Sequence, residues 1–441
     1  MGDVRDEART PRHAAEALDV AHAVLRTLAG PDAVAADTGI PGGPDGAPRE
    51  NLWTPSGFAA VSLAFSGTTA RDPEHIAGAH AHLLRALEAV AEGVPAPAGI
   101  LSGTSGAAYA LLIAHRATGG YRSALERLDA YHRDLVRKTL PAVTDGPVAT
   151  NHEFEAIYGM SGIGRHLLAR GDRSREELHA ALDYLTGLAL GDTTVGGHRV
   201  PRWWSRSAPK KGQEVELPDG HLNLGLAHGI PGPLALLALA WRHGVAVEGQ
   251  REAIENLVGL LERWAVPDGD GLHWPPFLTL GHWAAGPESL RLPWQRPSWC
   301  YGAPGVSRAV QLAALALDRP DWHDLAHRSL LPLLERPVAD WGLEDAALCH
   351  GTGGVLHLLG LLGEHIDDDR IPAVRDELAA LTLAHFHEDH RFGFRAAMTN
   401  VLHGADLSGF LDGAAGIALA LDAYANGGRA HAEWDMALLV N

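Results

Sequence analysis

Cys349-His-Gly-Thr-Gly-Gly354 is one copy of a short pattern that recurs along this chain of 441 residues. In each copy a Gly-x-x-Gly step leads into an apolar run, which here is Val355–Leu362. The other clear copies are Leu101-Ser-Gly-Thr-Ser-Gly106, Ile157-Tyr-Gly-Met-Ser-Gly162, Ala227-His-Gly-Ile-Pro-Gly232, Cys300-Tyr-Gly-Ala-Pro-Gly305 and Leu411-Asp-Gly-Ala-Ala-Gly416. A weaker copy surrounds Ser56-Gly57-Phe58 and precedes them. One such step carries little information, but repeated copies in phase indicate a repeat architecture of seven units.

The spacing of the copies predicts pairs of helices. The first glycines of the clear copies fall at positions 103, 159, 229, 302, 351 and 413, which leaves room for two helices and their loops in each unit. The apolar runs predict inner helices that are buried on all sides. Amphipathic segments between them predict outer helices; these are Pro11–Ala29, Asp72–Glu92, Tyr121–Leu140, Ser174–Leu190, Arg251–Val266, Asp321–Pro337 and Arg370–His387. We therefore predict an all-α fold, an α/α toroid of seven inner helices ringed by seven outer ones.

Two long irregular stretches interrupt this rhythm. They are Asp192–Leu224 and Pro267–Ser298, and the second contains several prolines and tryptophans. Long loops in a compact domain usually serve function. We predict that both stretches form rims around a central cavity of a single domain spanning residues 1–441, in which residues 1–51 supply an outer helix and a linker.

Composition narrows the functional classes. The chain is 46% hydrophobic and 20% charged, so it can bury a large core, and its formal net charge of -18 argues against a nucleic-acid surface. The charged start, Met1–Arg12, has no apolar stretch of a signal peptide, and no apolar run elsewhere is long enough for a membrane helix. We expect a cytoplasmic protein.

One local basic cluster departs from the acidic character of the chain. It consists of Arg202, Arg206, Lys210 and Lys211. The cluster is typical of a solvated loop, and it is also suited to gripping an acidic peptide segment. The sequence leaves both interpretations open.

The two cysteines of the chain predict a metal site. Cys300 and Cys349 occupy the same position of the repeat, two residues before the first glycine, in consecutive units. His350 follows the second cysteine directly. Two thiolates and one imidazole with a fourth position left open are the pattern of catalytic zinc. The alternative is a pair of buried cysteines or a disulfide.

His228 stands one residue before the first glycine of its unit, in the position that His350 has in another unit. A histidine at the same rim as a metal site is suited to proton transfer, because its unperturbed pKa of about 6.5 is close to neutral pH. The alternative is a structural histidine that bonds the loop backbone.

Three strings carry a family resemblance: Asn223-Leu-Gly-Leu-Ala-His-Gly229, Ser298-Trp-Cys-Tyr-Gly302 and Leu348-Cys-His-Gly351. Together they resemble the motifs of the lanthionine synthetase C-like family, and the likeness extends from about Leu52 to the end of the chain. The resemblance implies an α/α toroid that binds one zinc ion, here through Cys300, Cys349 and His350. It also implies a free-standing lanthipeptide cyclase, which adds cysteine thiols of a precursor peptide to dehydroalanine or dehydrobutyrine and closes thioether rings.

The resemblance implies roles for further residues. Zinc would lower the pKa of the peptide thiol, and His228 would protonate the enolate that forms. Tyr301 and Arg296 match active-site positions of the family, and either would steady the enolate oxygen; their alternatives are packing and a surface ion pair. Glu155 stands where bacterial cyclases of the family usually carry aspartate, and it would orient His228 or tune its pKa. Asp412 is expected to cap its helix.

The expected partners are a dehydrated precursor peptide with its leader and a separate dehydratase, because the chain has no kinase or dehydratase motif. Two other functions remain open. A non-catalytic member of the family would bind a thiol peptide or glutathione as a scaffold. A toroidal glycoside hydrolase would use a carboxylate pair such as Glu155 and Asp412, and it would not need zinc.

Overall fold

The computed structural model describes residues 10–35, 57–70, 73–91, 99–101, 103–209, 215, 217–397 and 404–441. Most of the predicted linker before residue 52, together with Lys210 and Lys211 of the basic cluster, lies outside the described residues. Helices dominate what is described, which confirms the all-α class. Within these ranges, no helix has both the length and the hydropathy that a membrane span requires.

The α-helices have the following bounds: α1 Ala14–Thr27, α2 Pro31–Ala35, α3 Phe58–Gly67, α4 Pro73–Ala91, α5 Gly103–Thr118, α6 Arg122–Thr139, α7 Met160–Arg170, α8 Arg175–Ala189, α9 Pro231–Arg242, α10 Gln250–Arg263, α11 Leu280–Ala285, α12 Ala303–Leu317, α13 Pro320–Arg328, α14 Leu331–Leu334, α15 Thr352–Gly363, α16 Arg370–Ala384 and α17 Ala414–Ala425. Short 3₁₀ segments are η1 Asn151–Glu153, η2 Gly171–Ser174, η3 Pro287–Ser289, η4 Val338–Trp341 and η5 His431–Leu438. The chain divides into two compact units. Unit 1 comprises Met1–Val94, Ala110–Arg122 and Val338–Trp434, and unit 2 comprises Pro95–Tyr109, Ser123–Pro337 and Asp435–Asn441.

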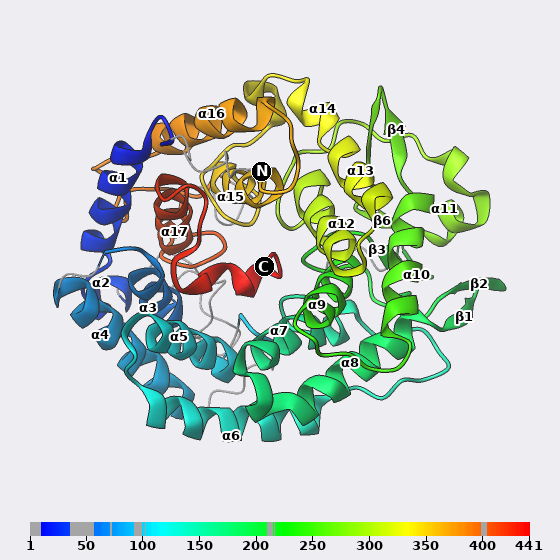
Figure 1. Cartoon of the computed structure of the whole chain (residues 1–441), viewed down its shortest axis with the longest axis horizontal. Helices are drawn as coiled ribbons and strands as arrows, with labels where there is room; N and C mark the ends of the chain where they lie inside the picture. Colours follow the sequence, from blue (N-terminus) through cyan, green and yellow to red (C-terminus); the bar gives the residue numbers. More distant parts are fainter. Residues whose placement is uncertain are drawn as a thin grey trace, which may run out of the picture. The chain divides into compact units, whose positions relative to one another are not determined.

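Unit 2 contains a row of apolar helices covered by amphipathic ones. Helix α7 packs against α9, and α9 packs against α12. Every side chain from Pro231 to Ala240 in α9 is buried, as expected of an inner helix. Helices α8, α10 and α13 pack on the outside of this row (Figure 1). The alternation that the sequence predicts is therefore present in this unit.

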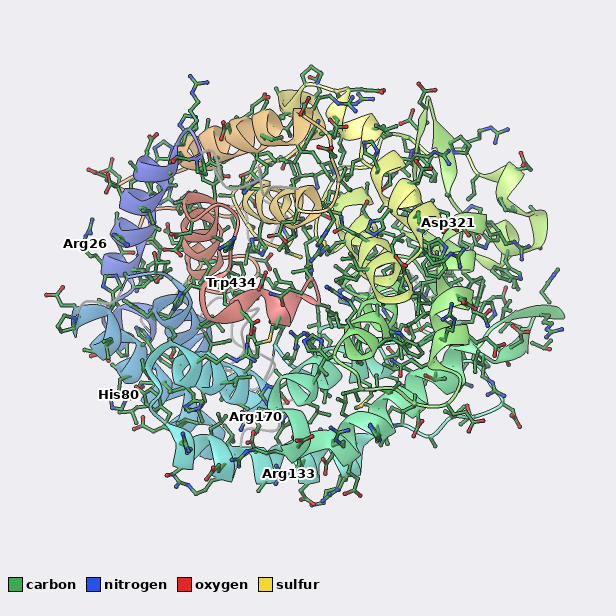
Figure 2. All side chains as sticks on the ribbon, viewed as in Figure 1. Arg26, His80, Arg133, Arg170, Asp321 and Trp434 are labelled. Carbon is green, nitrogen blue, oxygen red and sulfur yellow. The ribbon has the colours of Figure 1, made fainter. Side chains whose placement is uncertain are left out.

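Unit 1 repeats the arrangement. Its inner helices α3, α17 and α15 pack in that order, and their partners α4, α1 and α16 form the outer layer. Residues Ala414–Tyr424 of α17 are all buried. Polar side chains such as Arg26 on α1 and His80 on α4 lie on exposed faces of the outer helices (Figure 2). The full count of seven inner and seven outer helices stays a prediction.

One predicted outer helix is interrupted. The sequence predicts a continuous helix over Asp321–Pro337, but α13 ends at Arg328 and the short α14 begins at Leu331. The reason is Pro332, which has no N–H to donate to the Arg328 carbonyl and whose ring would clash with that carbonyl in a regular helix. The other predicted outer helices agree with the structure to within a few residues at each end.

The repeated glycines have a steric cause. In four copies the second glycine lies in the first turn of an inner helix, directly against the carbonyl oxygen of the residue six positions earlier. A Cβ atom would lie 2.0 Å from Ala156 O at Gly162, 2.2 Å from Trp299 O at Gly305, 1.8 Å from Leu348 O at Gly354 and 1.8 Å from Phe410 O at Gly416. No side chain fits at these distances, so these four helices begin with their backbone in contact with their own approach loops; at Gly232 the same contact is looser, with 3.1 Å to Leu226 O.

The two irregular stretches contain short antiparallel ladders, which the sequence analysis did not predict. Strand β1 (Asp192–Val195) pairs with β2 (His198–Pro201), and β4 (Val266–Asp268) pairs with β5 (Gly271–His273). Strand β3 (Leu222–Asn223) pairs with β6 (Phe277–Leu278) and so joins the two stretches. Strands of two to four residues are too short to give an alternation that a sequence pattern can reveal.

The segment Asp435–Asn441 is buried in unit 2 and ties its inner helices together. The Arg165 side chain on α7 donates to Asn441 O at 2.8 Å, and the Arg308 side chain on α12 donates to Val440 O at 2.7 Å. The Trp299 indole N–H donates to Leu438 O at 2.9 Å. These bonds fix the loop that leads into α12.

The glycine contacts predict a sharp difference between two alanine substitutions. Gly162→Ala places a methyl group 2.0 Å from Ala156 O, so we expect a loss of about 1–3 kcal/mol in the free energy of unfolding. Gly259→Ala is the control, because this exposed position of α10 has no atom within 4 Å of the new Cβ. Here we expect a gain of about 0.5–1 kcal/mol from reduced backbone entropy in the unfolded chain. Denaturant titration measures both, and equal stability of the two variants would contradict the steric explanation.

Candidate functional site

Cys300 lies on the loop before α12. The Ser298 hydroxyl accepts from the Tyr301 N–H at 2.9 Å and donates to the Tyr301 carbonyl, so it closes the loop on itself. Its oxygen is 3.5 Å from Cys300 Sγ. Gly302 adopts φ 95°, a left-handed conformation, and a Cβ there would lie 2.9 Å from Arg296 O. The local sequence therefore holds the Cys300 thiol at a defined and partly exposed position.

Cys349 and His350 lie on the loop before α15. The Cys349 N–H donates to Leu411 O at 2.9 Å, which ties this loop to the one before α17. His350 is buried, and its Nε2 is 3.6 Å from Asp412 Oδ1. Asp412 directly precedes Gly413, the N-cap of α17, and the expectation that its side chain caps this helix stays a prediction. The carboxylate faces the histidine ring.

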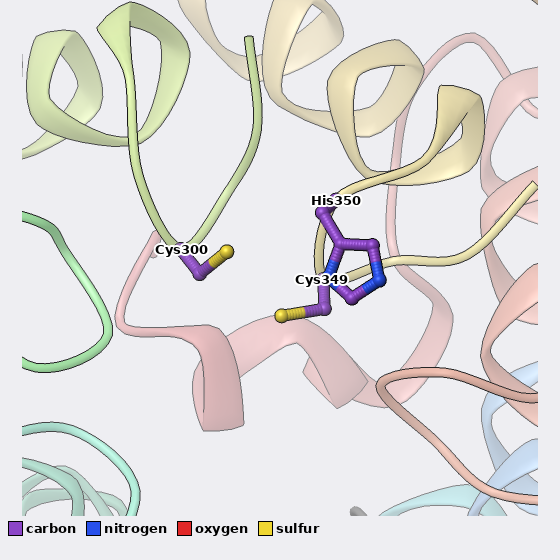
Figure 3. A group of neighbouring side chains, drawn as sticks. All are labelled: Cys300, Cys349 and His350. Carbon is purple, nitrogen blue, oxygen red and sulfur yellow. The ribbon is translucent and has the colours of Figure 1, made fainter. Parts of the chain in front are cut away.

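The two thiols and the imidazole form a group of donors. Their ligand atoms lie within 4.8 Å of one another, and both cysteines are free, which contradicts the disulfide alternative (Figure 3). Two sulfurs bound to one tetrahedral zinc ion are about 3.8 Å apart, so the group needs little movement to hold such an ion. Asp412 Oδ1 lies 3.6 Å from Nε2 of His350, so Nδ1 would be the nitrogen turned toward a metal ion, as in carboxylate–histidine pairs at zinc.

His228 is held by Glu155. His228 Nδ1 donates to Glu155 Oε2 at 2.6 Å, and the Glu155 side chain has no exposed surface, whereas 26% of the His228 side chain is exposed. The other Glu155 oxygen accepts from the N–H groups of Gly159, at 3.1 Å, and Tyr158. These donors belong to the start of α7, where a negative charge is favoured. Because Nδ1 is bonded, Nε2 is the nitrogen that His228 presents to a ligand.

The pKa of His228 lies above its ordinary value of 6.5. Burial lowers it, but the hydrogen bond from His228 to Glu155 and the charges of Glu155 and Cys300 outweigh burial. Backbone bonds keep His228 close to the cysteine loop, because the Ala227 N–H donates to Cys300 O at 3.3 Å. The carbonyl of His228 accepts from Asn151 Nδ2 at 3.0 Å. These contacts favour the protonated form of the His228 ring.

Tyr301 lies beside His228, and their ring centroids are 6.2 Å apart. The Tyr301 hydroxyl accepts from Asn223 Nδ2 at 3.0 Å, and this bond orients the phenol ring beside His228. Asn223 Nδ2 is also 3.4 Å from His221 Nε2. Burial lowers the pKa of His221 to about 4, so this ring is neutral, and its Nδ1 donates to Ser207 O at 2.8 Å.

The structure thus brings His228, Glu155 and Tyr301 together beside the Cys300 loop. Arg296 lies on this loop with its carbonyl against Gly302, and the role of its guanidinium stays a prediction. The sequence analysis assigned no role to Asn223 or Ser298, which orient Tyr301 and its loop. Both residues begin strings that carry the family resemblance. The sequence therefore marks their positions, but it does not indicate what their side chains bind.

Comparison with known proteins places these features in a family. The family model described as "Lanthionine synthetase C-like protein" matches residues 56–439. Among curated proteins, the chain is similar to the nisin biosynthesis protein NisC of Lactococcus lactis subsp. lactis, with 24% identity over 279 residues. That alignment covers 63% of this chain and 65% of the relative, so the chain spans just under two thirds of the curated relative's length.

A solved structure of a nisin cyclase has the same fold. It superposes with a TM-score of 0.75 and 20% identity, over 89% of this chain and 93% of the solved chain. This likeness confirms the expected fold class. The match of the family model to most of the sequence shows that the chain belongs to the lanthionine synthetase C-like family.

Proposed function

We propose that this protein is a zinc-dependent lanthipeptide cyclase that forms lanthionine and methyllanthionine rings. The observation that carries the proposal is the grouping of two free thiols and one imidazole within 4.8 Å. Membership of the family supports it. One zinc ion held by Cys300, Cys349 and His350 would bind the cysteine sulfur of a precursor peptide and lower the pKa of that thiol.

His228 is proposed as the proton donor. In the reaction the peptide sulfur forms a bond to the β-carbon of dehydroalanine or dehydrobutyrine, and the π electrons move toward the adjacent carbonyl oxygen. The α-carbon then takes up a proton, so that S–H is added across the double bond and no oxidant or reductant is needed. His228 Nε2 is suited to deliver this proton, because Glu155 fixes Nδ1 and raises the pKa of the ring.

Tyr301 and Arg296 are proposed to stabilise the enolate oxygen. The bond from Asn223 orients the Tyr301 hydroxyl beside His228, where it would donate to the oxygen of the reacting residue. Arg296 would supply positive charge from the same loop. Both residues bind the developing charge, whereas Glu155 acts through His228 and is a positioning residue.

The proposed setting follows from this chemistry. The substrate is a dehydrated precursor peptide with its leader, and a separate dehydratase supplies it. We place the reaction in the cytoplasm, where free thiols persist. The domain is proposed to be a single α/α toroid spanning the chain, with the stretches 192–224 and 267–298 at the rim of its cavity.

Zinc content tests the donor set. We expect about one zinc ion per wild-type chain, and its loss in Cys300→Ala, Cys349→Ala and His350→Ala. His179→Ala, a change on the outer helix α8, is the control and keeps the metal. Elemental analysis of protein purified without chelators gives the result. A folded wild type that takes up no zinc would refute the proposed site and with it the thiol-activating mechanism.

Ring closure tests His228 separately from the metal. His228→Asn keeps its zinc, and its cyclisation of a dehydrated peptide is expected to slow by about 10²–10⁴-fold, the usual contribution of a general acid. Mass spectrometry after thiol alkylation counts the rings. The non-catalytic scaffold predicts no ring closure even by the zinc-loaded wild type, so the same assay separates the two functions.

Glu155→Gln tests the positioning of His228. Removal of the carboxylate charge lowers the pKa of His228, since Glu155 raises it now. The protonated form is then lost at a lower pH, and the alkaline decline of the cyclisation rate shifts in the same direction. NMR titration of the imidazole and a pH–rate profile measure both shifts.

Two variants serve as controls for this titration. Glu155→Asp keeps the carboxylate and is expected to restore the wild-type profile at least in part. Glu153→Gln removes a neighbouring carboxylate that accepts from the Ala149 N–H and leaves the profile in place. An unchanged His228 titration in Glu155→Gln would exclude the proposed coupling.

A further inference from the structure

A cavity of about 480 Å³ opens beside His228 in unit 2. Its walls come from three segments, 150–152, 206–209 and 217–218, and from His228 itself. This volume is in the range of ligand pockets. The wall next to His228 is firmly built, because Asn151 donates to the His228 carbonyl and Thr150 caps the 3₁₀ segment η1.

Arg206 supplies the positive charge of this cavity. Its side chain is exposed and lines the space, and in the described part of the chain no carboxylate pairs with it. The neighbouring arginines are different. Arg202 pairs with Asp145 at 3.1 Å, and Arg199 pairs with Asp192 at 2.5 Å. Within the described residues, the Arg206 guanidinium therefore has hydrogen-bonding capacity that no carboxylate takes up.

The chemistry of the wall selects the ligand. A guanidinium binds a carboxylate through two parallel hydrogen bonds. Thr150, Asn151 and Ser207, which carry hydroxyl or amide groups, also line the cavity. The chain as a whole carries a net charge of -18, so an acidic group is repelled by most of the surface and is attracted locally here.

We propose that this cavity is a substrate subsite in which Arg206 binds an acidic side chain of the precursor peptide near the dehydroamino acid. The inference rests on the proposed cyclase function and adds a determinant of specificity to it. A cavity of this volume is roughly 8 Å across, which is the reach of two to three extended residues. The acidic residue is therefore two or three positions from the residue that His228 protonates.

Synthetic peptides with one cysteine and one dehydroalanine test this subsite. Each pair of peptides differs only by Glu or Gln at one position, and the four pairs place this residue two or three residues before the dehydroalanine and two or three residues after it. For the wild type, kcat/KM is expected to be about three- to tenfold higher for the Glu peptide in at least one pair. The preference falls as ionic strength rises, because the charges are partly exposed.

The variants identify the residue responsible. Arg206→Gln is expected to reduce the Glu-to-Gln ratio to about one. Arg202→Gln is the matched control, since Arg202 is paired with Asp145 and does not line the cavity; it keeps the wild-type ratio. Thermal unfolding checks that both variants are folded. A wild type without preference, or an Arg206→Gln variant that retains it, would overturn the inference.

Two further measurements separate related explanations. Peptides with a free or an amidated C-terminus show whether the arginine binds the terminal carboxylate, and a preference that follows the terminus would also overturn the inference. Fluorescence anisotropy of the same labelled peptides measures binding without turnover. If the wild type closes no ring, the cyclase proposal fails, while the ratio of dissociation constants for Glu and Gln peptides still decides the role of Arg206.

Discussion

Contact between backbone atoms at the start of the inner helices is the constraint on which this structure depends. In four of the copies the second glycine lies against the carbonyl oxygen of the residue six positions earlier, at distances that exclude any side chain. This contact folds the approach loop back over the end of its helix. The residues just before the first glycine, including Cys300, Cys349 and His228, are thereby placed on the short loops at these helix starts. The residues proposed to bind the metal and to transfer the proton therefore lie on loops whose positions the glycines fix.

The start of α7 adds electrostatics to this geometry. Glu155 is buried, and His228 is its ion-pair partner among the described residues. Its second oxygen accepts from two backbone N–H groups. A helix start stabilises such a carboxylate, and the carboxylate in turn stabilises a protonated imidazole. The extra methylene of glutamate, relative to the aspartate usual in the family, does not prevent this contact. The longer side chain bonds His228 through one oxygen and the N–H groups of Tyr158 and Gly159 through the other.

Much of this arrangement can be predicted from the sequence, because repeats and hydrophobic periodicity depend on local residue order. The outer helices, the buried inner helices and the shared register of Cys300 and Cys349 all follow from such order. Contacts between distant segments leave no such trace. Asn223 reaches Tyr301 across 78 positions, and the two-residue strands β3 and β6 meet only in three dimensions. The approach of Asp412 to His350 was not predicted for the same reason, because the two residues are remote in sequence.

The bond from Trp299 to Leu438 O has a consequence for biosynthesis. These residues are 139 positions apart, and a ribosome that adds about 5–20 residues per second needs roughly 7–28 s to cover that distance. During this time the loop of Cys300 is outside the ribosome without the segment that backs it. Arg165 likewise lacks its acceptor until Asn441 has been made, and Arg308 lacks its acceptor until Val440 has been made. The loop of Cys300 therefore gains this support only after residues 438–441 have been made, and a chain released before them presents Cys300 on an unsupported loop.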